Sequence, residues 1–224
     1  MKVLINEEKM SNIITKMEEQ KKNKNRISIF IDNEFSFGVY HKTVIKFDLF
    51  VGKELTIELI DQIKTDDEYD KCFNKALNYI SYQSRTIKEV KDKLYANEYL
   101  TPTINNVIKE LLKLNYIDDF EYARMYIEYK IKEMGSYKIK NKLIEKGVDE
   151  SIIEELLVGY SEDDEYETAY IIANKKNSQY GDIDYKKRYS RLSGLLNRKG
   201  YSYQIIYRVM SDILDKYKNG ENDF

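Results

Sequence analysis

A pattern of apolar residues that recurs three times constrains the fold of this 224-residue chain more than any other feature. If Leu94, Leu143 and Leu196 are aligned, apolar or aromatic residues recur at fixed offsets around them, and each copy carries an alanine in its first helix. The equivalent sets are Val90, Ile139 and Leu192; Tyr99, Val148 and Tyr201; Ile104, Ile153 and Ile206; Val107, Leu156 and Val209; and Ala76, Ala123 and Ala169. The aligned leucines lie 49 and 53 residues apart, a spacing typical of helical repeats.

Beyond about residue 66 the apolar residues follow the 3.6-residue period of an α-helix. Nine helices are predicted, at 68–82, 86–97, 102–115, 119–133, 136–146, 150–159, 162–178, 185–199 and 203–218. Terminal signals support these ends: capping-box spacings at Thr86–Glu89 and Asp118–Glu121, an N-cap and N1 pair at Thr101–Pro102, and C′ glycines at Gly147 and Gly200.

The nine helices group into three copies of a three-helix repeat, predicted at 67–117, 118–160 and 161–224. Because a unit of this size has a thin core, neighbouring repeats are expected to stack into an elongated, curved array. The alternative is a single helical bundle whose self-similarity is accidental. The offsets shared by all three copies favour the array, so the predicted fold is mainly α.

From about residue 11 to 58 the chain follows a different pattern, with a period near two that is typical of β-strands. Alternating or apolar segments lie at 27–31, 35–39 and 44–51. A short polar turn at 32–34 separates the first two. We expect a small antiparallel β-rich domain over 1–66 with about five strands, and an exposed hairpin tip in the sequence QKKNKN at 20–25.

The chain has one cysteine, Cys72, and one histidine, His41, which excludes several kinds of site. An intrachain disulfide and a CxxC zinc site need at least two cysteines. A single histidine argues against most His-dependent chemistry, including a Ser–His dyad and a His-ligated metal centre. The sequence also contains no HExxH motif, no P-loop and no glycine cluster that would hold a phosphate. Asp118 and Asp119 are interpreted as a helix start rather than a metal pair, and Cys72 as a core residue. We therefore expect a binding protein that is not an enzyme and has no cofactor or metal.

Charged residues make up 34% of the chain, but 37 basic side chains are balanced by 39 acidic ones. Binding to nucleic acid would therefore depend on local segregation of charge. The first twenty residues carry charge where a signal peptide would be apolar, and no apolar run approaches the roughly 18 residues of a membrane span. The expected location is the cytoplasm, without membrane attachment.

The third repeat is the electrostatic outlier, with nine basic and two acidic side chains between residues 170 and 210. The basic residues are Lys175, Lys176, Lys186, Lys187, Arg188, Arg191, Arg198, Lys199 and Arg208. Helical spacing predicts that Arg188, Arg191 and Arg198 share one face, where guanidinium groups would bind phosphates or carboxylates. Tyrosines interleave with them and would stack on bases or fill partner pockets. The alternative is a solvated basic face with the tyrosines in the core.

A second basic stretch lies in the middle repeat, where Lys138 and Lys142 are four residues apart and share a face. If both stretches line one side of a curved array, they form a continuous positive track. The sequence therefore predicts a partner- or DNA-binding surface that includes Lys138, Lys142 and the nine basic residues of the third repeat.

Four segments between about residues 70 and 215 recur in one known family. They are Ser84-Arg85-Thr86 with Glu89-Val90 and Lys93-Leu94; Leu111 to Asp119 with Tyr122-Ala123; Gly135-Ser136 with Ile139, Leu143 and Lys146-Gly147-Val148; and Leu195-Leu196 with Arg198-Lys199-Gly200-Tyr201-Ser202. In this order and spacing the chain resembles the RecX family, bacterial regulators of the RecA recombinase. One departure is Glu98, where the family's first repeat usually has glycine, so we expect that helix to end without a left-handed cap.

The resemblance implies a non-enzymatic modulator. Members of the family bind RecA–DNA filaments along the helical groove and generally restrain filament growth, strand exchange and ATP hydrolysis by RecA. Some also bind DNA weakly on their own, so weak binding of single- or double-stranded DNA is expected. The expected partner is the RecA filament, and the expected state of the chain is a monomer.

Two other functions remain open. Three-helix units resemble helix-turn-helix arrangements, so the chain is alternatively a sequence-specific DNA-binding regulator, which needs a recognition helix with exposed Arg, Asn or Gln. A scaffold for an unrelated protein partner is the third hypothesis.

Overall fold

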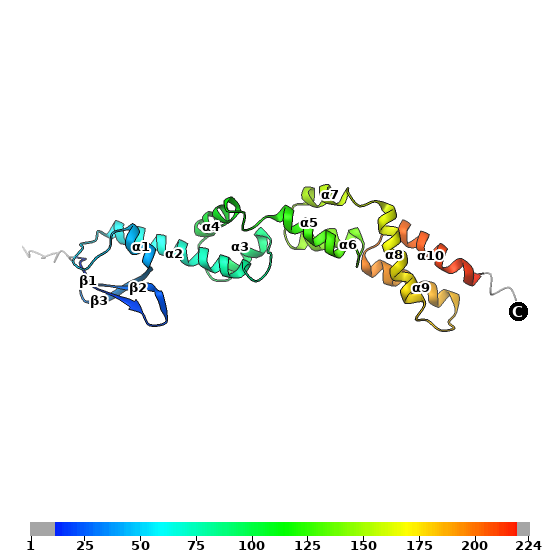
Figure 1. Ribbon diagram of the computed structural model, residues 1–224, viewed down its shortest axis with the longest axis horizontal. Coiled ribbons are helices and arrows are strands. Elements are labelled where there is room, and N and C mark those ends of the chain that lie inside the picture. Colours follow the sequence, from blue (N-terminus) through cyan, green and yellow to red (C-terminus); the bar gives the residue numbers. More distant parts are fainter. Residues whose placement is uncertain (1–11, 219–224) are drawn as a thin grey trace, which may run out of the picture. The chain divides into compact units, whose positions relative to one another are not determined.

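The computed structural model describes residues 12–218 (Figure 1), so the outer ends of the predicted first and last domains, 1–11 and 219–224, lie outside the described residues. The chain forms two compact units. The N-terminal unit comprises the residues up to 81 together with 93–110, and the C-terminal unit comprises 82–92 together with the residues from 111 onward.

The N-terminal unit contains a three-stranded antiparallel sheet in the order β1-β2-β3. Its strands are β1 (Ile14–Gln20), β2 (Asn23–Ile31) and β3 (Glu34–Tyr40). Asp32 and Asn33 connect β2 to β3 with φ values of 51° and 70°, the left-handed conformation of a tight hairpin turn that Asp and Asn tolerate well. The predicted polar turn is therefore confirmed.

The prediction of about five strands was wrong, because the part of this unit that the structure describes has three. The apolar segment at 44–51 is not a strand; it begins in helix α1 (His41–Lys46) and continues in turns. Val44 and Phe47 are three residues apart and both pack against the core, whereas Ile45 between them is 80% exposed. A short helical turn therefore produces an apolar cluster that looks like strand alternation in sequence.

Helix α2 (Ile57–Ile80) begins eleven residues before its predicted start, inside the predicted β-rich domain. Its N-cap is Thr56, whose side chain accepts a hydrogen bond from the Leu59 N–H. The helix was predicted at 68–82, but its first eleven residues were missed because its buried face combines apolar and acidic residues: Ile63 is fully buried, but the next turns bury Asp67 and Asp70. Two buried aspartates hide the 3.6-residue apolar period.

These aspartates join α2 to strand β2 and to helix α1. Asp67 accepts from the guanidinium of Arg26 on β2 at 2.9 Å, and Asp70 pairs with Lys42 at 2.5 Å. The Arg26 guanidinium also lies over the Tyr40 ring, 4.6 Å from its centroid. Burial alone would lower the pKa of Arg26, but its hydrogen bond to Asp67 raises the pKa above its usual value. Arg26 is therefore charged at neutral pH, and its ion pair with Asp67 fixes the position of β2 against the helix.

The remaining helices follow the predicted repeats, with ends within three residues of those expected. They are α3 (Ile87–Tyr95) and α4 (Thr101–Lys113); α5 (Asp119–Lys130), α6 (Ser136–Glu145) and α7 (Glu150–Leu157); and α8 (Glu162–Asn177), α9 (Tyr185–Lys199) and α10 (Tyr203–Lys218). The aligned leucines Leu94, Leu143 and Leu196 are fully buried, as is the alanine of each copy. A small antiparallel sheet followed by three tandem three-helix repeats is thus the architecture of the chain.

Left-handed residues end the second helix of each repeat. Gly147 and Gly200 have φ values of 85° and 84°, as their predicted C′ positions require. The expectation that Glu98 would end its helix without such a cap was wrong, because its φ is 62°. A Cβ at Gly147 or Gly200 would lie within 2.4 Å of a lysine side chain of the preceding repeat. Glu98 is exposed, so its Cβ has room and only the modest cost of a left-handed residue applies, about 1 kcal/mol.

Candidate partner-binding surface of the third repeat

Helix α9 carries the densest group of predicted binding residues. Its N-cap, Asp184, accepts from the Lys187 N–H at 3.1 Å, and Gly200 ends it. The first turn contains Lys186, Lys187 and no acidic residue. Positive charge at a helix N-terminus opposes the helix dipole and destabilises the helix. Helix stability therefore does not explain these lysines, and they remain candidate binding residues.

The two faces of α9 differ in charge. Leu192 and Leu196 are buried in the core of the third repeat. Lys187, Arg191 and Arg198 are exposed, and their spacing of four and seven residues places them on one face. None of the three forms an ion pair with another residue in the part of the chain that the structure describes. Their charges are therefore available to a partner.

Arg188 lies apart from this face, and its side chain is almost fully buried at 5% exposure. Its Nη1 donates to the side-chain oxygen of Asn177 at 2.7 Å, and its Nη2 donates to the Gly181 carbonyl at 2.7 Å. These bonds fix the connection between α8 and α9. The structure therefore does not place Arg188 with Arg191 and Arg198, and we leave it out of the surface proposed below.

The ring of Tyr180, in the α8–α9 connection, lies among several cations. Lys176 Nζ and the Arg191 guanidinium are 5.7 Å and 5.6 Å from its centroid, and the Arg188 guanidinium is 6.0 Å away. Lys176 also donates to Gln179 at 3.0 Å. Cations over an aromatic face are held by its quadrupole. Tyr180 therefore positions the Lys176 and Arg191 side chains at this end of the third repeat.

A groove of about 490 Å³ lies between α9 and α10. Its polar wall is formed by Ser190, Ser193 and Asn197 on α9, and Gly194 lacks a side chain that would fill it. Tyr203, 76% exposed, forms part of the opposite side. Hydroxyl and amide groups lie next in sequence to Arg191 and Arg198, so the groove offers hydrogen bonds beside positive charge. We call this groove and the cations Lys187, Arg191 and Arg198 the α9 surface.

Sequence reasoning found the cations of the α9 surface but missed the groove. Its signal is present in the sequence: Ser190, Ser193, Gly194 and Asn197 recur at intervals of three and four residues, on a different side of the helix from Leu192 and Leu196. Small residues at helical spacing leave space beside a neighbouring helix. That signal was masked by the more conspicuous arginines and lysines around it.

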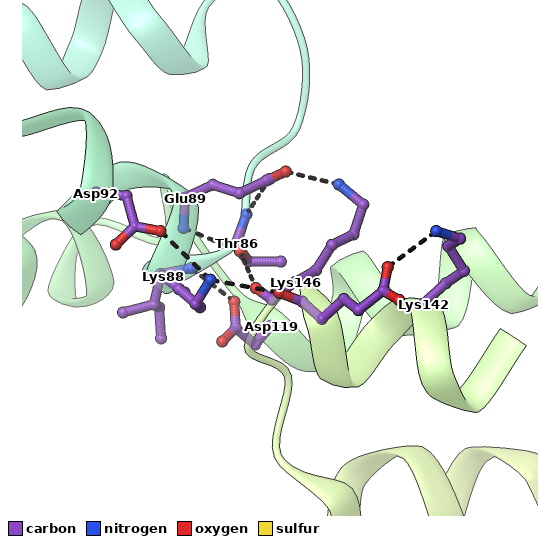
Figure 2. A network of polar contacts seen from close by, with 9 residues as sticks. Thr86, Lys88, Glu89, Asp92, Asp119, Lys142 and Lys146 are labelled. Carbon is purple, nitrogen blue, oxygen red and sulfur yellow. Dashed lines mark hydrogen bonds and ion pairs between the residues drawn. The ribbon is translucent and has the colours of Figure 1, made fainter.

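The contacts between the first and second repeats belong to the C-terminal unit and position α6 (Figure 2). Thr86 donates to the Lys146 carbonyl at 2.7 Å, and Lys146 Nζ lies 2.6 Å from a carboxylate oxygen of Glu89. Asp119, at the start of α5, accepts from the Ile87 N–H at 2.8 Å. Figure 2 shows Glu89 and Lys146 pointing toward each other across this junction.

The second and third repeats meet in a similar way. Glu165, on the first helix of the third repeat, accepts from the Ser136 N–H at 2.7 Å, as Asp119 accepts from Ile87. Lys138 Nζ donates to the Arg198 carbonyl at 2.8 Å, and Lys199 Nζ donates to the Glu133 carbonyl at 2.6 Å. The structure thus brings Lys138, Arg198 and Lys199 together, and Lys138 and Lys199 join the repeats.

The other predicted basic residues have local partners. Lys142 pairs with Glu145 at 2.9 Å, and Arg208 pairs with Asp163 at 2.7 Å while lying over the Tyr166 ring. Three further lysines of the middle repeat are also paired: Lys130 with Glu133, Lys140 with Glu150 and Glu154, and Lys146 with Glu89. Lys132 is exposed and forms no ion pair with another described residue. Exposed cations that form no ion pair within the described residues therefore lie on the third repeat and also elsewhere, as at Lys132 and at Lys21, Lys22 and Lys24 of the N-terminal unit. Whether any of the predicted residues contacts a partner stays a prediction.

The junction between the first two repeats gives a pH-dependent prediction. Burial alone would raise the pKa of Glu89, but hydrogen bonds from Lys146 and the Thr86 N–H lower it below the ordinary value of 4.5. A carboxylate with a lowered folded-state pKa stabilises the fold above its unfolded-state pKa, and this contribution is lost as the pH falls through the folded-state value. Glu89→Gln is therefore expected to lower the free energy of unfolding at pH 7 by about 1 kcal/mol.

Urea denaturation between pH 3 and pH 7 checks this expectation, because the difference between the two proteins must shrink as the pH falls below 4.5. Glu155→Gln is the matched control, since Glu155 on α7 is exposed and forms no ion pair with another described residue. A difference that stays constant with pH would show that the Glu89 charge does not stabilise the junction.

Little in the described residues suits catalysis. Burial raises the pKa of the Cys72 thiol to about 11, and nearby Glu68 acts in the same direction. A thiol with this pKa remains protonated at neutral pH and is a poor nucleophile. No group of three His, Cys, Asp or Glu residues that could hold a metal ion occurs in the described chain. Between residues 12 and 218, no helix combines the length and apolarity that crossing a membrane requires.

Four family models match the chain in sequence order. The regulatory protein RecX N-terminal domain matches residues 12–56. The first, second and third three-helix domains of RecX match residues 72–111, 118–157 and 162–210. The matched ranges follow the sheet and the three helical repeats described above.

Relatives and solved structures agree with these matches. The regulatory protein RecX of Clostridium tetani is 35% identical over 211 residues, which cover 93% of this chain and 97% of the relative. That of Bacillus subtilis is 35% identical and covers 93% and 79%. A crystal structure of regulatory protein RecX has a TM-score of 0.70 at 30% identity and covers 89% of this chain and 98% of its own. One of RecX from Lactobacillus salivarius has a TM-score of 0.60 at 34% identity, with coverages of 66% and 97%. The chain therefore belongs to the RecX family of regulatory proteins.

Proposed function

We propose that this chain binds RecA–DNA filaments and restrains filament extension and ATP hydrolysis by RecA, as part of the control of recombination and DNA repair. Membership of the RecX family supports this role. The protein acts without a cofactor and in the cytoplasm, where the filament forms on DNA.

The observation that carries the proposal is the α9 surface. A filament of protein on DNA presents phosphates and carboxylates, and Lys187, Arg191 and Arg198 offer exposed charge to both. The groove beside them adds hydroxyl and amide groups that bind the same partner through hydrogen bonds. Lys175 on α8 and Lys186 on α9 are exposed as well and add positive charge to the third repeat.

The DNA-dependent ATPase of RecA tests the function. Addition of this protein at a substoichiometric ratio to RecA is expected to slow ATP hydrolysis, because one bound molecule stops extension of a filament of many subunits. Filament length, measured by electron microscopy, is expected to fall in parallel. Unchanged ATPase rate and filament length over the full titration would rule the proposal out.

A sequence-specific DNA-binding regulator is the second candidate, because α9 exposes Asn197 with Arg191 and Arg198. These are the residue types that read base edges in a major groove. Competition between duplexes of different sequence separates the two functions. Strong preference for one duplex favours the regulator, whereas binding that is indifferent to sequence and sensitive to salt favours the filament. Capture of a different protein from a lysate that lacks RecA would favour a scaffold.

A further inference from the structure

The hairpin tip between β1 and β2 has no part in the proposed function, although it is strongly basic. Lys21, Lys22 and Lys24 are exposed, and none forms an ion pair with another residue of the described chain. Beside the tip lies a pocket of about 460 Å³ whose walls come from the hairpin, from the start of α1 and from α2. All of these elements belong to the N-terminal unit.

Side-chain amides from two elements line this pocket. Asn23 and Asn25 come from the hairpin, and Asn74 and Asn78 come from α2. The two α2 residues are four positions apart and so lie on one face of the helix. Within the described residues, the amide groups of Asn25, Asn74 and Asn78 make no hydrogen bond. Each therefore has a free donor and a free acceptor for a ligand.

Two planar side chains, held in place by other residues, also line the pocket. Tyr40 and His41 line the pocket, and the Arg26 guanidinium supports the Tyr40 ring at 4.6 Å. His41 Nε2 donates to the Lys24 carbonyl at 3.1 Å, which ties the imidazole to the hairpin tip. A carbonyl can only accept, so this nitrogen carries the proton. Two rings are thus positioned before a ligand arrives.

The charge around the pocket favours an anionic ligand. The Lys42 side chain lines it and is neutralised by Asp70, and the Glu19 carboxylate lies 4.0 Å from His41 Nε2. The three tip lysines outweigh these groups. A phosphate backbone that passes the tip would meet lysine side chains on one side and amides on the other.

We propose that the tip lysines and this pocket bind single-stranded nucleic acid, with the lysines on the phosphates and one unpaired base in the pocket. Base edges present paired donors and acceptors, which side-chain amides match, and unpaired bases stack on planar side chains. An acidic peptide is the less suitable ligand, because it would use the tip lysines but not the three side-chain amides that make no hydrogen bond. The site is separate from the α9 surface, and its test requires no RecA.

Photo-crosslinking of the full-length protein to a short oligothymidylate that contains 5-iodouracil tests this site directly. Mass spectrometry of the digested adduct is expected to place the crosslink on Tyr40 or His41. Lys21→Glu with Lys22→Glu is expected to reduce this adduct roughly tenfold, because two phosphate contacts are lost. The matched control is Lys16→Glu with Lys64→Glu, which changes the charge of the same unit equally at exposed positions away from the tip and is expected to keep the adduct.

A second variant separates the base from the phosphates. Asn74→Ala with Asn78→Ala is expected to retain binding of an abasic oligonucleotide while losing the preference for one that carries bases. Adducts confined to the third repeat, or an adduct at Tyr40 and His41 that the tip variant leaves unchanged, would overturn the proposal. So would competition by free thymidine monophosphate at the concentration of the oligonucleotide, because the pocket would then take a nucleotide rather than a strand. Since crosslinks identify the residue, failure here leaves the filament proposal standing.

Discussion

Replacement of Gly135 by alanine is expected to lower the free energy of unfolding of the C-terminal unit by about 3 kcal/mol. A Cβ at this position would lie 2.3 Å from the Gly200 carbonyl oxygen and 2.7 Å from the Tyr201 nitrogen. Both are backbone atoms, so neither can rotate away. Gly135 has a φ of −73°, which alanine adopts freely, and the expected loss is therefore steric. Relief of the clash would also break the hydrogen bond from the Gly135 N–H to the Lys199 carbonyl at 2.9 Å.

Thermal and urea unfolding measure this effect, with Gly159→Ala as the matched control. Gly159 is exposed, and a Cβ there would meet its nearest neighbour, the Leu156 carbonyl oxygen, at 3.8 Å. The control is therefore expected to change stability by less than about 0.5 kcal/mol. If both variants unfold alike, close backbone approach does not stabilise the contact between the second and third repeats.

Reversal of three charges on the α9 surface is expected to weaken binding to RecA–DNA filaments, or to DNA alone, by at least roughly tenfold at physiological salt. The variant carries Lys187→Glu, Arg191→Glu and Arg198→Glu. All three side chains are exposed and form no ion pair within the described chain, so the helices are expected to remain folded. Arg188 is kept, because its buried bonds to Asn177 and Gly181 hold the loop.

Fluorescence anisotropy over a range of salt concentrations measures the affinity and the number of phosphate contacts, since each lost contact reduces the salt dependence. The control variant carries Lys16→Glu, Lys64→Glu and Lys109→Glu, an equal change of net charge at exposed positions of the N-terminal unit. An equal loss in both variants would mean that only overall charge matters. Unaltered binding of the α9 variant would move the filament contact to another face.

The sequence predicted the fold best where the buried face of a helix is purely apolar. Helix α9 has its predicted ends because Leu192 and Leu196 repeat without interruption. Prediction failed over the first eleven residues of α2, where the buried Asp67 breaks the apolar period, since a buried carboxylate cannot be told from a surface one until its partner is known. That partner, Arg26, lies 41 residues away in sequence.

The same limit applies to the candidate site. Exposed Lys187, Arg191 and Arg198 were predicted correctly as surface cations, but helical spacing alone assigned Arg188 to their face. Its burial depends on Asn177 and on a backbone carbonyl in the α8–α9 connection. Hydrogen bonds of this kind depend on how a loop folds, and the spacing of residues along a helix does not predict the fold of a loop.

The absence of a side chain at Gly135 also affects whether the second repeat can be transferred alone in protein engineering. As the N-cap of α6 it has no side chain to bind the first N–H groups of the helix. The missing group comes from Glu165 of the following repeat, which accepts from Ser136. Gly135 thus allows the third repeat to pack closely, and the third repeat in turn caps helix α6. A middle repeat that is moved into another protein therefore needs the Glu165 carboxylate of the third repeat. The two repeats are best transferred together.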